Sequence, residues 1–121
     1  MPDYPRRRLP QTFLPLTVPV FQILLSLSDQ DLHGYAIIQD VRERTEGEVE
    51  LTASTLYAAI KRLLDGRLIE ELDTRPGEGD DARRRYYRIT ALGVDVARLE
   101  AGRLARALKM ARQKKLAPRR V

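Results

Sequence analysis

Residues 51–71 read LTASTLYAAIKRLLDGRLIEE and contain one complete helix with both of its boundary signals. The apolar side chains that recur at helical spacing are Leu56, Ile60, Leu63 and Leu64. Thr52 precedes them and can accept a hydrogen bond from a free backbone N–H of the first turn, as N-cap residues do. Gly66 follows them, and glycine is common where the backbone turns left-handed after a helix. We therefore predict a helix over about 53–65 with one buried face.

The opposite face of this helix is small, polar and partly basic. It carries Ser54, Thr55, Ala58, Lys61, Arg62 and Asp65, with Tyr57 beside them. Such a helix, about 10–12 Å across, fits a DNA major groove about 12 Å wide. Each candidate also has a structural interpretation. Ser54 and Thr55 can serve the start of the helix, and Tyr57 can be a core side chain with its hydroxyl satisfied. Lys61 and Arg62 either contact phosphates or are simply solvated.

Downstream of this helix the hydrophobic period changes from helical to alternating. Residues 67–73 (RLIEELD) and 84–90 (RRYYRIT) are rich in Ile, Leu and Tyr and predict two strands. The segment between them supplies the Pro and Gly residues of a turn, so the two strands are expected to form a β-hairpin. Alternation in the second strand directs Tyr87 and Ile89 inward.

A long helix is expected after the hairpin, from about Ala91 to Lys115, with Thr90 as its N-cap. Its apolar stripe consists of Leu92, Val96, Leu99, Leu104, Leu108 and Ala111. At ~1.5 Å per residue this helix is about 37 Å long. One small domain cannot cover such a stripe, so the helix needs a second protein surface.

Two more helices are expected upstream. The first lies within TVPVFQILLSLS (17–28), where Thr17 can cap the helix and Pro19 is tolerated in its first turn. The second runs from about 33 to 45, and Gly47 ends it.

A very short strand is expected at 48–51, where polar and apolar residues alternate. The order helix, helix, short strand, helix, hairpin is that of a winged helix-turn-helix, a fold that is mainly α with a small β-hairpin. We divide the chain into a flexible basic arm (1–12), a winged-helix DNA-binding domain (13–90), a C-terminal dimerisation helix (91–116) and a basic tail (117–121).

The composition excludes several classes of protein. The chain has 121 residues, enough for one domain, and 43% of them are hydrophobic. It has no cysteine and one histidine, which excludes disulfides, thiolate metal sites, cysteine nucleophiles and sites built on paired histidines. We find no catalytic triad, glycine-rich phosphate loop or metal-ligand spacing, so we expect neither an enzyme nor a cofactor or metal. No apolar stretch reaches ~18 residues, and we expect a soluble cytoplasmic protein that does not enter a membrane.

The net charge is +5, and the basic residues are clustered along the chain. Excess positive charge favours polyanions such as nucleic acids. Residues 101–121 contain eight basic residues and no acidic ones. Three interpretations of this run stay open: a longer DNA footprint, the solvated face of a dimer helix, or cations that suit a helix C-terminus. A second cluster consists of Arg83, Arg84, Arg85 and Arg88. We expect at least one of the first three to contact DNA, at the base of the expected hairpin and not at its tip.

Three stretches share their motifs and their spacing with a known family. They are HGYAIIQDV (33–41), LTASTLYAAIKRLLDGRLIEE (51–71) and RRRYYRITALG (83–93). Together they resemble the PadR-like transcriptional regulators, over about residues 14–115, in the compact subgroup with one short C-terminal helix. The resemblance implies a DNA-binding regulator, typically a repressor, that acts as a homodimer on a pseudo-palindromic operator. Some relatives respond to a small hydrophobic or aromatic effector; this chain has no Trp, and its effector stays open.

These patterns and the resemblance give two sets of candidate residues. The DNA-binding set is Ser54, Thr55, Tyr57, Lys61, Arg62, Arg83, Arg84 and Arg85. The dimerisation set is Phe21, Leu92, Val96, Leu99, Leu104, Leu108 and Ala111. Phe21 is included because the first helix of the family also contributes to the dimer. His33 begins the second helix, and we interpret it as structural rather than as a pH-sensitive or ligand contact.

Two other functions are compatible with the same fold: a protein-interaction module that does not read DNA, and a DNA-binding protein without operator recognition. The salt dependence of binding separates the first from a DNA-binding protein. Neutralising ~6–10 phosphates costs about 10³–10⁵ in affinity between 50 and 200 mM salt.

Overall fold

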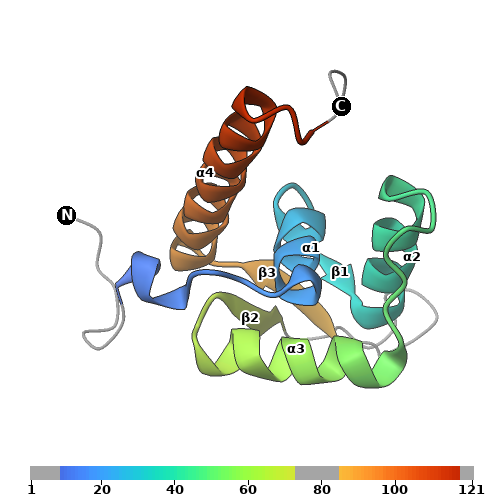
Figure 1. Cartoon of the computed structure of the whole chain (residues 1–121). Coiled ribbons are helices and arrows are strands. Elements are labelled where there is room, and N and C mark those ends of the chain that lie inside the picture. The colour runs from blue at the N-terminus through green and yellow to red at the C-terminus, as the bar shows by residue number, and fades with distance from the viewer. Residues whose placement is uncertain (1–8, 73–84, 118–121) are drawn as a thin grey trace.

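The computed structural model describes residues 9–72 and 85–117 (Figure 1). The elements are η1 (Pro10–Phe13), α1 (Val18–Leu27), β1 (Leu32–His33), α2 (Gly34–Arg44), α3 (Ala53–Asp65), β2 (Ile69–Leu72), β3 (Tyr86–Ile89) and α4 (Ala91–Gln113). In Figure 1, α1 lies between α4 and α2, and α3 crosses below them. The C-terminal half of α4 projects beyond the rest of the chain. The expected fold, mainly helical with a small antiparallel sheet, is confirmed.

The sheet has three antiparallel strands in the order β1-β3-β2. Its register places Ile69 opposite Ile89 and Leu32 opposite Tyr87. Tyr87 is buried and Ile89 is half-buried, so the predicted alternation in β3 is confirmed. The expected turn of the hairpin, within 73–84, lies outside the described residues.

The hydrophobic core lies where α1, α2, α3 and the first turns of α4 meet the sheet. Its fully buried aliphatic side chains are Ile23, Leu24, Leu27, Ile37, Val41, Leu56, Leu63, Ile69 and Val96. Each such side chain contributes about 1.5–3 kcal/mol relative to an exposed position. The core therefore fixes how α3 is held against α1 and α2.

Side-chain caps determine where four helices begin. The hydroxyls of Thr17, Thr52 and Thr90 each accept a hydrogen bond from the backbone N–H three residues on, at 3.3, 3.1 and 3.0 Å. His33 caps α2 in the same way, because its Nδ1 accepts from the Ala36 N–H at 3.2 Å. The three threonine caps and the structural role of His33 are confirmed.

The prediction that Gly66 adopts the left-handed conformation is wrong. Gly66 has a φ of −84°, and Arg67 has the positive φ of 62°. The helix still closes in a Schellman pattern, in which the Leu68 N–H donates to the Leu63 carbonyl at 2.9 Å. Glycine at 66 provides space instead, because a Cβ there would lie 2.9 Å from the Phe13 ring.

The prediction of a short strand at 48–51 is wrong. The short strand of the sheet is formed by Leu32–His33 instead. Val49 is held in a turn, because its N–H donates to the Thr45 hydroxyl at 3.0 Å. A strand of two residues has no hydrophobic period of its own. Leu32–His33 is a strand only because it pairs with the edge of β3 that β2 leaves free.

The prediction of a flexible arm over 1–12 is wrong for its last residues. Residues 1–8 lie outside the described residues, but Pro10–Phe13 forms a 3-10 turn that packs against α4. The ring of Phe13 also packs against the core. A large apolar side chain close to a helical body is sufficient to order this segment.

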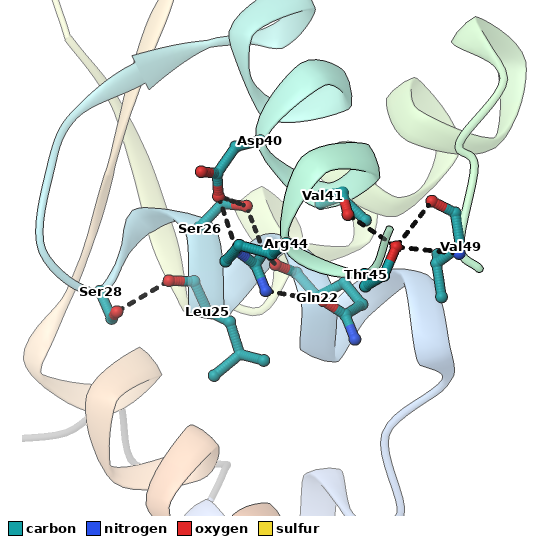
Figure 2. A network of polar contacts seen from close by, with 9 residues as sticks. All are labelled: Gln22, Leu25, Ser26, Ser28, Asp40, Val41, Arg44, Thr45 and Val49. Atoms are coloured by element: carbon teal, nitrogen blue, oxygen red, sulfur yellow. Dashed lines mark hydrogen bonds and ion pairs between the residues drawn. The ribbon is translucent and has the colours of Figure 1, made fainter. Parts of the chain in front are cut away.

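A polar network joins α1 to α2 (Figure 2). Ser26 is 1% exposed, and its Oγ donates to Asp40 Oδ2 at 2.7 Å. Arg44 Nε donates to the same oxygen at 2.8 Å, and its Nη1 donates to Gln22 Oε1 at 3.0 Å. Burial acts to raise the pKa of Asp40, but the hydrogen bonds from Arg44 and Ser26 outweigh it and hold this pKa below its usual value. The satisfied network fixes the two helices relative to each other.

Candidate nucleic-acid interface

One face of α3 is open to solvent along its whole length, and α3 forms the lower edge of the chain in Figure 1. The exposed residues of α3 are Ala53, Ser54, Thr55, Tyr57, Ala58, Lys61, Arg62 and Asp65. The structure therefore brings together on one helix all five candidates predicted there. The Thr52 hydroxyl donates to Thr55 Oγ1 at 3.0 Å. This hydrogen bond orders the first turn of α3, the part of a recognition helix that contacts base edges in the major groove.

The two cations of α3 are not equivalent. Lys61 Nζ lies 3.1 Å from Asp65 Oδ2, in an exposed ion pair one turn along the helix. Within the described part of the chain, Arg62 has neither an ion pair nor a side-chain hydrogen bond. A phosphate contact by Lys61 would compete with Asp65, whereas Arg62 has its full charge and five N–H donors available.

Aromatic side chains connect α3 and the sheet to the start of α2. Tyr57 is 53% exposed, which excludes the core interpretation for it. A Cβ on Gly34 would lie 2.6 Å from the Tyr57 hydroxyl oxygen, so glycine is needed for Tyr57 to lie across this helix start. The rings of His33 and Tyr86 meet edge-on, with centroids 5.3 Å apart. These contacts fix α3 and β3 relative to each other.

The candidates in the wing are only partly described. Arg85 is exposed, and its Nε lies 3.8 Å from Glu71 Oε2 on the neighbouring strand. Arg83 and Arg84 lie outside the described residues. Arg85 thus lies at the end of the paired strands that leads into residues 73–84, directly before the Leu72–Tyr86 pair, with an acidic neighbour.

A groove of about 410 Å³ extends the α3 surface toward the start of α1. It is lined by Thr17, Pro19, Val20, Thr55, Ala58, Ala59 and Arg62. Its polar groups are two hydroxyls and the Arg62 guanidinium, which are the side-chain types that contact phosphate oxygens. Sequence reasoning did not connect the start of α1 with α3, because the two segments are far apart in the chain.

The apolar stripe of α4 divides into a buried part and an exposed part. Leu92 and Val96 are 4% and 0% exposed and belong to the core of this chain, so assigning them to a dimer surface is wrong. The first turns of α4 cover the domain itself. The rest of the set reaches the surface: Leu99 and Leu104 are 40% exposed, and Phe21, Leu108 and Ala111 are half-buried.

A buried carboxylate anchors α4 at the point where it leaves the body. Glu100 is 2% exposed, and Arg103 donates two hydrogen bonds to it from Nε and Nη2, both at 2.8 Å. These bonds, with a further one from the Leu16 backbone, lower the pKa of Glu100 although burial opposes them. The carboxylate therefore ties the segment before α1 to α4.

Sequence reasoning missed both polar anchors. Asp40 and Arg44 are spaced i, i+4, and Glu100 and Arg103 i, i+3, which signals a local ion pair on a helix. That spacing does not indicate burial. The contact with Ser26 crosses between helices, and no local pattern reveals it.

Known proteins are similar to this chain in both sequence and fold. The model of the transcriptional regulator PadR-like family matches residues 23–114. The chain belongs to this family. A PadR family transcription regulator from Clostridium difficile is 29% identical with a TM-score of 0.71, over 80% of this PadR-like chain and 97% of that one. A transcriptional regulator from Clostridium thermocellum is 27% identical with a TM-score of 0.68, over 78% and 87% of the two chains.

One curated relative of this PadR-like chain is an uncharacterized protein from Lysinibacillus sphaericus. The two are 37% identical over 71 residues, which are 59% of this chain and 63% of the relative. The match therefore spans less than two thirds of that protein. Family membership confirms a transcriptional regulator and not an enzyme. Among the described helices, none combines the length and the apolar character that a bilayer span requires.

Proposed function

We propose that this PadR-like regulator binds duplex DNA in a sequence-specific manner and represses transcription by occluding the polymerase. The observation that carries the proposal is the uninterrupted exposed face of α3. Small side chains at Ser54 and Ala58 allow close approach to base edges, and Arg62 supplies an unpaired cation for the backbone. Arg85, exposed directly before β3, is the second contact in this proposal, and Arg83 and Arg84 extend it.

The proposed DNA-binding unit is a homodimer. The winged-helix domain (13–90) reads DNA, and the C-terminal helix (91–116) pairs with its copy through Leu104, Leu108 and Ala111. The exposed apolar surface on the projecting half of α4 supports this, because one chain leaves it uncovered. Two α3 helices related by a two-fold axis would read half-sites about one helical turn apart.

Release from DNA is assigned in this proposal to a small hydrophobic or aromatic effector. Such a compound would change the spacing of the two α3 helices. It must then bind two states of the dimer with different affinities.

Fluorescence anisotropy tests the DNA-binding part. The protein is titrated with DNA from upstream of its own gene and with a scrambled duplex of equal length, at 50 and 200 mM salt. We expect a preference of about 10³ or more for the native duplex. Equal binding to both duplexes would favour a DNA-binding protein without operator recognition, and no binding would favour an interaction module.

The two cations of α3 provide a matched pair of variants. Arg62→Gln is expected to weaken binding to every sequence and to reduce the salt slope by about one. Lys61→Gln is expected to weaken binding less, because Asp65 already neutralises Lys61. Leu104→Glu is expected to give a monomer in sedimentation velocity, with Leu116→Glu, past the end of α4, as the control that stays dimeric.

A further inference from the structure

Among the residues that the structure describes, the largest group of unpaired cations lies on α4 and not on α3. It comprises Arg98, Arg106, Lys109 and Arg112, all exposed, and we call it the α4 basic face. None of the four has an ion pair within 9–72 and 85–117. From residue 101 to the end of the sequence there is no acidic residue to neutralise them.

These cations occupy one side of the helix. With 3.6 residues per turn, their directions fall within about 120° of the helix circumference. Leu104, Leu108 and Ala111 fall within about 60°, in a sector whose centre is about 130° from the centre of the cations. A partner helix centred on the apolar sector would therefore leave Arg98, Arg106 and Lys109 open to solvent, with Arg112 at its border, about 70° from the centre of that sector.

The charges near α3 are more balanced. Lys61 is paired with Asp65, and Arg85 faces Glu71. Arg88 Nη2 lies 3.0 Å from Asp31 Oδ2. Of the described basic side chains on the α3 side, Arg62 on α3 and Arg67 just past its end are without an acidic partner. The positive charge that attracts polyanions without regard to sequence is thus concentrated on α4.

The two surfaces also lie apart. In Figure 1, α3 is at the lower end of the chain and the C-terminal half of α4 is at the upper end, beyond the three-helix body. A straight duplex lying along α3 runs across the end of the chain opposite to the far half of α4. DNA on the α4 basic face would therefore be a second duplex segment.

We propose that the α4 basic face is a second, sequence-independent binding surface for duplex DNA. From Arg98 to Arg112 the helix rises about 21 Å, which spans several phosphates of one strand. Three of the four cations are arginines, whose planar guanidinium groups bind phosphate oxygens in pairs. Duplex DNA is the occupant we choose because the charge is of one sign and because the proposed function of α3, on which this inference rests, brings DNA to the molecule.

The consequence is that one protein molecule holds two DNA segments. The segment on α3 is chosen by sequence, and the segment on α4 is held by its charge alone. A regulator with both surfaces would bring neighbouring DNA segments together.

A capture assay tests this inference with the full-length protein. A biotinylated scrambled duplex is immobilised, the protein is added, and retention of a second, fluorescently labelled scrambled duplex is measured. Wild type is expected to retain the second duplex. R106E/K109E is expected to retain at least about tenfold less, and its affinity for a scrambled duplex is expected to depend less on salt, with a slope smaller by about two.

The matched control is R42E/R67E, which makes the same charge change at two exposed residues outside the α4 basic face. It is expected to retain the second duplex. Far-UV circular dichroism and sedimentation velocity establish that both variants are folded and have the wild-type oligomeric state. The inference is overturned if wild type retains no second duplex or if R106E/K109E retains as much of it as wild type. It is also overturned if R106E/K109E and R42E/R67E lose retention of the second duplex to the same extent.

Failure of the proposed function has a different signature. R106E/K109E is expected to keep the preference for the upstream duplex over the scrambled one, because α3 is intact. If wild type shows no such preference yet retains a second duplex that R106E/K109E does not retain, the function proposed for α3 is wrong. The inference about the α4 basic face is then still supported.

Discussion

Replacing Gly93 with alanine is expected to destabilise the protein, although alanine is the better helix former. Gly93 lies in the first turn of α4, where this helix passes the start of β2. A Cβ at this position would lie 2.1 Å from the Leu68 carbonyl oxygen and 2.8 Å from Ile89 Cγ1. One of these contacts is with backbone, so it cannot be relieved by turning a side chain.

The magnitude follows from what the Leu68 carbonyl does. It accepts hydrogen bonds from the Thr90 N–H and from the Thr90 hydroxyl, both at 3.0 Å. Losing one or both costs about 1 kcal/mol each, and overpacking a filled site costs about 1–3 kcal/mol. The higher helix propensity of alanine stabilises the folded state and offsets about 1 kcal/mol of this loss. We expect Gly93→Ala to lower the free energy of unfolding by about 1–4 kcal/mol.

Gly102 in the same helix is the matched control. A Cβ there would meet only Arg106 Nη1, at 3.4 Å, and that side chain can move. Gly102→Ala is therefore expected to raise the free energy of unfolding by up to about 1 kcal/mol. Urea unfolding followed by circular dichroism, at one fixed protein concentration, measures both variants. If Gly93→Ala unfolds at the same urea concentration as wild type or a higher one, the close approach described above is refuted.

Two further predictions concern the polar anchors. Ser26→Ala removes a buried donor to the α1–α2 network and is expected to cost about 1–3 kcal/mol in urea unfolding, whereas Ser28→Ala at an exposed position should stay close to wild type; equal losses would contradict a special role for the network. Arg103 depresses the pKa of Glu100 in the folded state, so the stability that Glu100 adds is complete above its unfolded pKa, near 4.5, and is lost as the pH falls through the folded value. The stability difference between wild type and Glu100→Gln should therefore shrink on acidification, and a difference that stays constant with pH would show that ionisation is not its source.

Most helices of this fold are predictable from local pattern. The threonines before α1, α3 and α4, followed by residues at helical spacing, locate three helix starts, because capping and burial of one face act within a few turns of chain. The two longer strands follow from alternation around Tyr87. The exposed face of α3 also follows, because the residues that are not apolar on a half-buried helix must face solvent.

The local patterns fail where a contact joins distant segments. Gly66 matches a left-handed cap, but the packing of Phe13 against it is what requires glycine. Leu92 and Val96 match a dimer stripe, but the body of the same chain covers them. In both cases the pattern shows that a residue needs a neighbour without showing which neighbour it has.

The sequence by itself determined the class of fold, the helix starts and the exposed polar face of α3, since these depend on residues a few positions apart. Only the tertiary structure decided that Lys61 is paired and Arg62 is not, that Tyr57 lies across Gly34, and that the unpaired charge of α4 is far from α3. The physical reason is that burial and electrostatic interaction depend on distance in space. Composition and periodicity record only distance along the chain.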